Sequence, residues 1–183
     1  MSKTGKVLSA IAIVILLLVG CTFLLPRHVK VERSLAIDAP AEVVFSQVNG
    51  LRNWENWSPW KEKDPNMELT YGTPSAGAGA EYSWSSDHNE VGKGSLTIEA
   101  SEAPRMIKTK LQFEGMNPGY GGWNFEPKGN QTVVTWYMDS DMGNDPLGRV
   151  FGAFMDDLVG PDFEKGLANI KRISERTAKA SEG

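Results

Sequence analysis

Apolar side chains recur at three- and four-residue intervals through the C-terminal quarter of the chain, which predicts a long amphipathic helical segment over residues 144–180. Asp145 before Pro146 is typical of an N-cap followed by the first helical residue. Because Gly160 and Pro161 interrupt the pattern, we expect Pro161 to begin a second helical piece. The break is then either a hinge at the cavity mouth or a plain kink caused by the proline. The apolar face comprises Leu147, Val150, Phe151, Phe154, Met155 and Leu158, then Phe163, Leu167, Ile170 and Ile173.

The rest of the chain supplies the partner surface for this helix. Strict alternation from His28 to Asp38 predicts a half-buried strand, and helices are expected from Pro40 to Val48 and from Leu51 to Trp57, where Ser58-Pro59 ends the second. After Pro65 the period changes to two, with turn residues at short intervals, which predicts an antiparallel meander of six more strands. These strands are Met67–Gly72, Ala80–Ser85, Gly92–Ala100, Arg105–Phe113, Gly121–Glu126 and Thr132–Ser140.

This order of elements indicates an α+β fold. A curved seven-stranded antiparallel sheet would have its apolar face covered by helices, with the sheet curling around the long C-terminal helix. The gap between the sheet and that helix is where we expect a ligand to bind.

An apolar run at the N-terminus forms a second, smaller unit. Val7 to Leu25 is 19 residues without a charge, which is long enough to span a bilayer as a helix. We therefore divide the chain into an N-terminal membrane anchor, residues 1–26, and a folded domain, residues 27–183. The sequence Leu18-Val19-Gly20-Cys21 also resembles a lipoprotein signal that is cleaved after Gly20, with lipid attached to Cys21. The apolar residues that follow Cys21 favour the uncleaved anchor.

The short tail before the apolar run resembles a signal-anchor. Such a segment usually leaves its N-terminus in the cytoplasm, so we expect a single-pass protein of the cytoplasmic (inner) membrane with an extracytoplasmic domain. Basic residues on the two sides of the run are nearly equal in number, with Lys3 and Lys6 before it, so the charge pattern itself decides little.

Charge and composition exclude several classes of function. The domain carries all 23 acidic residues but only 17 of the 19 basic ones, a net charge of about −6, and nucleic-acid binding requires basic patches instead. Cys21, the one cysteine, lies in the apolar run, so no disulfide is expected within the domain. Two scattered histidines are too few for a metal site, and the glycine-rich stretches lack the strand-then-helix context of a nucleotide loop, so we expect neither a metal nor a cofactor.

Several stretches together resemble the SRPBCC superfamily, the START and Bet v 1-like helix-grip proteins that include polyketide cyclases/dehydrases and lipid-transport proteins. The stretches are Val31-Glu32-Arg33-Ser34 to Ala39-Pro40, Val43-Val44-Phe45, WENWSPW from Trp54 to Trp60, Gly79-Ala80, Gly92-Lys93-Gly94, and GPDFEKGLANIK from Gly160 to Lys171. The resemblance is closest to the bacterial branch with an N-terminal membrane segment. It implies a helix-grip fold around an apolar cavity and a hydrophobic ligand, but it transfers no catalytic residue.

Two sets of residues are candidates for lining this cavity. The apolar set combines strand and helix residues that should face each other: Trp84, Trp136, Met138, Phe151, Phe154 and Met155. The polar set, Glu81, Asp139 and Arg105, could orient a ligand or act as acid or base if it faces an apolar pocket, and otherwise lies on the solvent face.

The leading functional hypothesis is membrane-tethered binding or transport of a hydrophobic small molecule or lipid in the sheet–helix cavity. The first alternative is an enzyme of cyclase, dehydratase or hydrolase type that uses a pocket carboxylate. The second is a membrane-associated scaffold without a ligand, which would present an exposed apolar patch.

Overall fold

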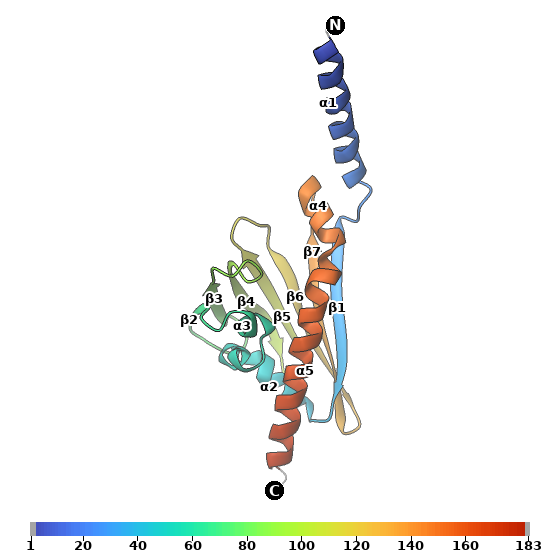
Figure 1. Ribbon diagram of the computed structural model, residues 1–183. Helices are drawn as coiled ribbons and strands as arrows, with labels where there is room; N and C mark the ends of the chain where they lie inside the picture. Colours follow the sequence, from blue (N-terminus) through green and yellow to red (C-terminus); the bar gives the residue numbers. More distant parts are fainter. Residues whose placement is uncertain (1–2, 182–183) are drawn as a thin grey trace.

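The computed structural model describes residues 3–181 and contains one seven-stranded antiparallel sheet crossed by a long helix (Figure 1). The strands run in the order β1-β7-β6-β5-β4-β3-β2. Their bounds are β1 His28–Ile37, β2 Glu68–Tyr71, β3 Glu81–Ser85, β4 Lys93–Glu102, β5 Met106–Phe113, β6 Gly119–Lys128 and β7 Gln131–Asp141. The predicted α+β helix-grip fold is confirmed by this sheet and the long C-terminal helix. The strands were predictable because alternating apolar residues bury one face of the sheet.

Within the described residues, six helices accompany the sheet: α1 Lys3–Thr22, α2 Ala41–Asn49, the 3-10 helix η1 Leu51–Asn56, α3 Pro59–Lys63, α4 Pro146–Ala153 and α5 Met155–Ser181. Helices α2 and α3 pack beside α5 (Figure 1). The sequence predicted that Ser58-Pro59 would end the second helix. The structure places these residues between η1 and α3, with Pro59 as the first residue of α3, a position where the missing proline N–H costs nothing.

Helix α1 projects from the β1 end of the domain (Figure 1). Its large apolar side chains are exposed from Val7 to Val19. Within the described residues, however, no helix combines the length and apolarity required to cross a membrane. The predicted transmembrane helix is therefore not confirmed. Residues 1–2 and 182–183, at the ends of the two predicted units, lie outside the described residues.

The C-terminal helical segment breaks seven residues earlier than the sequence predicted. As expected, Asp145 caps α4, where its carboxylate accepts hydrogen bonds from the backbone N–H groups of Leu147 and Gly148. The helix then ends at Phe154, and α5 runs without interruption through Pro161. The prediction that Pro161 begins a second piece and forms a hinge with Gly160 is therefore wrong.

An arginine from the sheet explains how α5 tolerates an internal proline, which normally costs roughly 3 kcal/mol. Arg33, on the inner face of β1, donates hydrogen bonds to Asp156 at 2.8 Å and to Glu164 at 2.8 Å. These carboxylates lie on either side of Pro161. Gly160 leaves room for the guanidinium, which a Cβ at this position would overlap. We call this arrangement the Arg33 bridge.

The Arg33 bridge operates at neutral pH. The hydrogen bonds from Arg33 lower the pKa of the Asp156 carboxyl below its ordinary value. A carboxyl whose pKa is lower in the folded state stabilises that state above its unfolded pKa, about 3.9, and the contribution is lost as the pH falls through the folded value. The bridge should therefore weaken only in acid.

The two halves of the apolar helical face have different environments. The α5 half is buried as predicted, with Phe163, Leu167 and Ile170 at most 2% exposed. The first half is not: its exposed residues are Leu147, Val150, Phe151, Phe154 and Leu158. Because the break at Phe154 separates α4 from α5, this apolar surface does not pack on the sheet.

Replacing Arg33 tests the bridge. Arg33→Met keeps an apolar stem but removes both ion pairs, so the first turns of α5 should open more often. We expect faster hydrogen exchange at the amides of residues 156–160, with little change at residues 167–170. Arg27→Met, which removes the ion pair with Asp141, is the control and should leave α5 exchange unchanged. Equal exchange in the Arg33 variant and the parent would contradict this role.

Candidate ligand-binding site

A group of stacked aromatic rings occupies the space between α5 and the inner face of the sheet. The Trp136 ring lies 4.0 Å from the Phe163 ring at an interplanar angle of 5°, and it also stacks on Trp123, 5.0 Å away at 25°. Trp54 and Trp57 contact Trp123 edge to face. Such contacts add to the apolar burial. Side chains therefore fill much of the volume where the sequence predicted a cavity.

The helix approaches this group closely because Gly166 faces it. A Cβ on Gly166 would lie 2.7 Å from Cζ3 of Trp136, which is far inside van der Waals contact. The absence of a side chain at this position thus sets the separation of α5 from β7. We call the five rings of Trp54, Trp57, Trp123, Trp136 and Phe163 the aromatic core.

Hydrogen bonding distinguishes the indoles of the aromatic core. The Nε1–H groups of Trp54 and Trp57 donate to the backbone carbonyls of Val48 and Gln47 at 2.8 and 3.0 Å. The Nε1–H of Trp123, only 1% exposed, has no hydrogen-bond partner among the residues that the structure describes. Buried polar groups are nearly always hydrogen-bonded, so this donor is an exception that needs an acceptor.

A second unpartnered group lies nearby on the same face. Thr109 on β5 is opposite Gly121 on β6, two residues before Trp123, and its hydroxyl is also buried without a partner in the described part of the chain. Ser174 on α5 is a third such residue. A polar ligand atom, or water, beside β5 and β6 could satisfy Trp123 or Thr109, whereas Ser174 lies farther along α5, next to Lys171 and Glu175, which bond to Ala36 and Asp38. Sequence reasoning missed Trp123 and Thr109. Each lies two residues from an apolar residue of the same strand, Phe125 and Ile107 respectively, and this spacing places it on the same, inner face.

The apolar candidates divide between the interior and the surface. Trp136, Met138 and Met155 are buried, at 4%, 9% and 7% exposure. Trp84 is partly buried on β3, where its indole donates to the Val91 carbonyl at 3.2 Å. The remaining two candidates, Phe151 and Phe154, are 45% and 56% exposed. They do not face the strand residues, because α4 leaves the sheet at the break after Ala153.

The polar candidates lie on the surface. Glu81 alternates with the inward-facing Tyr82, and its carboxylate is on the solvent side near Thr97. Asp139 follows the inward-facing Met138 and is exposed. Arg105 lies before β5 and pairs with Glu102 at 3.1 Å. Their assignment to an apolar pocket is therefore not supported.

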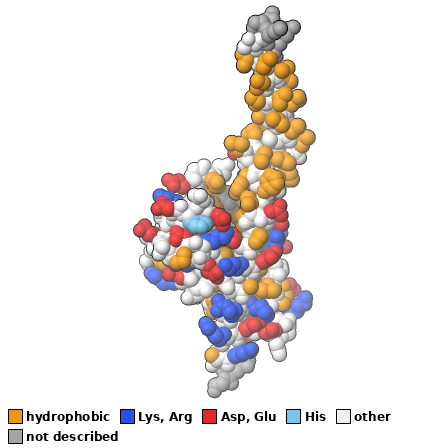
Figure 2. Space-filling model, in the orientation of Figure 1, with side chains coloured by type: hydrophobic (Ala, Val, Ile, Leu, Met, Phe, Trp, Pro, Cys, Tyr) orange, Lys and Arg blue, Asp and Glu red, His pale blue; other side chains and the backbone are white. Residues whose placement is uncertain are grey.

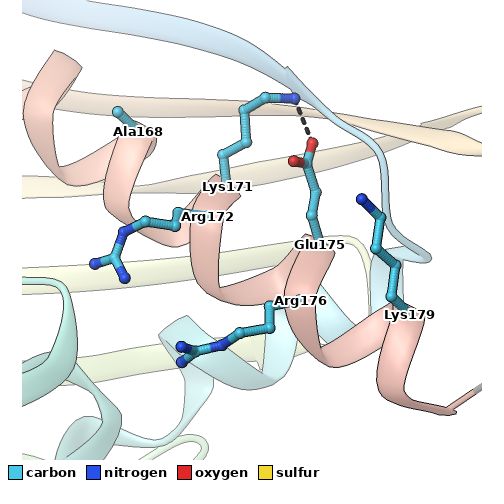
Figure 3. A pocket seen from close by; sticks show the side chains of 6 residues that line it. All are labelled: Ala168, Lys171, Arg172, Glu175, Arg176 and Lys179. Carbon is cyan, nitrogen blue, oxygen red and sulfur yellow. Dashed lines mark hydrogen bonds and ion pairs between the residues drawn. The ribbon is translucent and has the colours of Figure 1, made fainter.

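Two hollows of the described structure lie at its surface, and one of them borders Trp54 of the aromatic core. A pocket of about 430 Å³ follows one face of α5 and is lined by Ala168, Lys171, Arg172, Glu175, Arg176 and Lys179 (Figure 3). Lys171 bonds to Glu175 there. A cleft of about 10 Å³ between η1, α3 and the β2–β3 edge is lined by residues that include Trp54, Tyr71 and Tyr82. That volume holds about one water molecule, so no ligand fits without movement of side chains.

The two tyrosines beside this cleft remain neutral, and Glu55 and Lys61 also line it. Burial raises the pKa of the Tyr82 phenol above its ordinary value, so Tyr82 stays protonated. Burial also raises the pKa of Tyr71, whose hydroxyl donates to Glu55 at 2.8 Å. Among residues 3–181, no group of three metal-ligating side chains is suitably placed for a metal ion.

Comparisons with known proteins identify both sequence and fold similarity. The sequence profile described as "Polyketide cyclase / dehydrase and lipid transport" matches residues 28–175. No curated protein has significant similarity to the chain.

Solved structures share the fold at low sequence identity. The di-domain ARO/CYC protein StfQ from the steffimycin biosynthetic pathway is 12% identical with a TM-score of 0.65, and the match covers 83% of this chain and 52% of StfQ. Protein SA2116 from Staphylococcus aureus is 13% identical with a TM-score of 0.63, and the match covers 83% of this chain and 96% of SA2116. Protein CV1439 from Chromobacterium violaceum is 11% identical with a TM-score of 0.57, and the match covers 82% of this chain and 99% of CV1439.

A pair of threonine variants tests whether the Thr109 hydroxyl is unpartnered in the ligand-free protein. Thr109→Val removes a buried polar group that lacks a bond, so we expect the free energy of unfolding to rise by about 1 kcal/mol. Thr132 is equally buried, but its hydroxyl donates to the Ala39 carbonyl at 2.8 Å. Thr132→Val should instead destabilise by about 1–3 kcal/mol. Urea denaturation measures both, and similar destabilisation by the two changes would contradict the assignment.

Proposed function

The chain belongs to the polyketide cyclase/dehydrase and lipid transport family, and we propose that it binds a hydrophobic small molecule or lipid between the sheet and α5. The observation that carries this proposal is the buried Nε1–H of Trp123, which lacks an acceptor among the described residues inside an otherwise aromatic core. Unpartnered buried donors are costly, and a ligand that brings an acceptor would remove this cost.

The surroundings of Trp123 define the chemistry of the proposed ligand. Aromatic rings offer apolar and stacking surface, while Trp123 can donate one hydrogen bond and Thr109 can donate or accept another. An apolar molecule with a carbonyl or hydroxyl oxygen fits this combination. Because the aromatic core is packed, binding requires rings of the core to move aside as the ligand enters.

Binding has more support than catalysis by a pocket carboxylate. That alternative needs Glu81 or Asp139 to face the interior, and both are exposed on the other face of the sheet. Arg33 does face α5, but its guanidinium is held by Asp156 and Glu164. The family description names cyclases and dehydrases as well as lipid transport, and the residues on the inner face favour the second activity.

We also propose that α1 attaches the protein to the cytoplasmic membrane, with the domain outside the cytoplasm. The support is the uncharged run from Val7 to Leu25 in the sequence and the exposure of the large apolar side chains of α1. Exposed apolar surface of this extent is typical of segments that contact other molecules or lipid.

Ligand binding by the full chain can be tested with two probes, oleic acid for lipids and anthraquinone for planar aromatic carbonyl compounds. We expect at least one probe to quench tryptophan fluorescence saturably and to stabilise the protein against unfolding. Trp123→Phe keeps the ring but removes the N–H, so the affinity should fall roughly five- to ten-fold, equivalent to one hydrogen bond of about 1 kcal/mol.

Trp84→Phe is the matched control for this experiment, because Trp84 lies outside the aromatic core and its N–H is satisfied by Val91. It should leave probe affinity nearly unchanged. Extraction of the purified protein followed by mass spectrometry would identify a retained natural ligand. Absence of a retained molecule, together with no stabilisation by either probe, would reject the binding function.

Membrane attachment is tested by fractionation of cells that produce the full chain. We expect the protein to remain in membranes after a high-salt wash, because apolar attachment is not screened by salt, and to be released by detergent. A Leu16→Lys variant should weaken retention, since a charge in the middle of an apolar helix costs about 2.5–3.5 kcal/mol. A periplasm-active reporter at the C-terminus tests the side. Release of the protein by the salt wash would contradict attachment by α1. Activity of a cytoplasmic reporter alone would contradict the location of the domain outside the cytoplasm.

A further inference from the structure

Exposed apolar side chains of the domain gather at one end of the molecule. Within residues 3–181, the large exposed apolar residues beyond α1 are Phe23, Leu24, Met116, Tyr120, Leu147, Val150, Phe151, Phe154 and Leu158. Strand pairing places Tyr120 at the end where β1 begins, because it is opposite Asp139, which is opposite Lys30 near the start of β1. Figure 2 shows apolar atoms continuing from α1 onto this end of the domain.

Helix α4 contributes the most continuous part of this surface. Leu147 is 80% exposed, and Val150, Phe151 and Phe154 follow it on the same short helix and at its end. We call these four residues the α4 patch. Its opposite side is anchored, because Gly152 packs tightly against Met142 and Val29. The apolar side chains are therefore held outward by the packing of the helix.

Arg149 fixes the α4 patch relative to α1. Its guanidinium is buried and donates from Nη1 to the backbone carbonyls of Phe23 and Leu25 at 3.1 and 3.0 Å. Its Nε donates to the Gly143 carbonyl at 3.0 Å, and it lies over the Phe23 ring at 5.2 Å. The connection between α1 and β1 is thereby bonded to the start of α4.

A second set of bonds holds the same connection. Arg27 forms a bidentate ion pair with Asp141 at 2.7 and 2.8 Å, and the Met142 N–H donates to the Arg27 carbonyl at 2.9 Å. The domain is thus not suspended from α1 by a free linker. Wherever the C-terminal end of α1 lies in a bilayer, the α4 patch must lie beside it.

We propose that the α4 patch docks the domain onto the lipid bilayer in which α1 is held, with its side chains at the boundary between head groups and hydrocarbon. The proposal takes from the proposed function only the attachment of α1. Continuity with α1 and the Arg149 bonds favour lipid over a second copy of the chain as the occupant. Exposed apolar helical residues next to a membrane segment are suited to this boundary.

Nearby charges predict the lipid dependence of docking. Asp145 caps α4, Asp156 pairs with Arg33, and Asp157 is an exposed carboxylate at the edge of the patch. With no excess of basic side chains to attract anionic head groups, docking should depend on apolar insertion. We expect it on phosphatidylcholine vesicles and expect little gain from phosphatidylglycerol.

A fluorescent label on the patch tests docking in the full chain. In a Cys21→Ser background, Leu147→Cys carries an environment-sensitive nitrobenzoxadiazole label, and the protein is reconstituted into phosphatidylcholine vesicles. We expect a blue-shifted emission that is quenched by lipids with nitroxide on the acyl chain. Lys128→Cys, in the exposed turn at the opposite end of the sheet, is the control. Its label should show the emission of a water-exposed fluorophore and no quenching by the lipid nitroxide.

Removal of apolar side chains completes the test. Phe151→Ser with Phe154→Ser should reduce the quenching at position 147, whereas Arg176→Ser with Lys179→Ser, at the far end of α5, should not. Both pairs are exposed, so circular dichroism should confirm an unchanged fold.

Three outcomes would overturn the proposal. If the protein floats with vesicles while the label at 147 remains in water, docking fails and attachment by α1 stands. If the protein does not associate with vesicles, both fail, and ligand binding by the aromatic core is unaffected. If the label shifts in detergent in proportion to protein concentration, a second copy covers the α4 patch.

Discussion

The continuity of α5 depends on one arginine that bonds to both sides of an internal proline. Arg33 ties Asp156 and Glu164 on either side of Pro161, and Gly160 leaves space for its guanidinium. As exposed ion pairs the two contacts have modest strength, but they act where the helix has lost a backbone hydrogen bond. Because α5 remains continuous there, the helical break falls instead at Phe154, and α4 presents Phe151 and Phe154 to the surface.

Continuity of α5 also sets how much room a ligand has. Gly166 brings the helix within contact of Trp136, and Phe163 stacks on the same indole. A bulkier residue at 166 would separate helix and sheet and leave a larger gap between them. With glycine, space for a ligand must come from displacement of aromatic rings, and the unpartnered Trp123 N–H supplies a favourable interaction to offset that displacement.

Sequence patterns predicted the strands well and the helical face poorly, for a physical reason. Alternation reports burial of one sheet face directly, so bounds such as His28–Ile37 followed from it. A helical stripe reports only that residues such as Phe151 are apolar, and lipid, a partner or a core could cover them. The expectation that Pro161 would begin a new helix considers only neighbouring residues. It failed because Arg33, far away in the chain, bonds to α5 on both sides of the proline. Whether Trp123 finds an acceptor depends on atoms of several elements, which no single pattern contains.

The first turns of α5 link the two proposals, because they border both surfaces involved. Met155 is buried in the hydrophobic core, whereas Leu158, one turn later, is 54% exposed on the end that carries the α4 patch. If that end lies on a bilayer, these turns would lie between the hydrocarbon and the aromatic core, so a path along them would keep an apolar molecule beside apolar side chains. An apolar ligand is more stable in the bilayer or in the aromatic core than in water. Such a path would therefore avoid the cost of exposing the ligand to water between the two. Docking and ligand binding would then be two steps of a single transfer rather than separate properties of the fold.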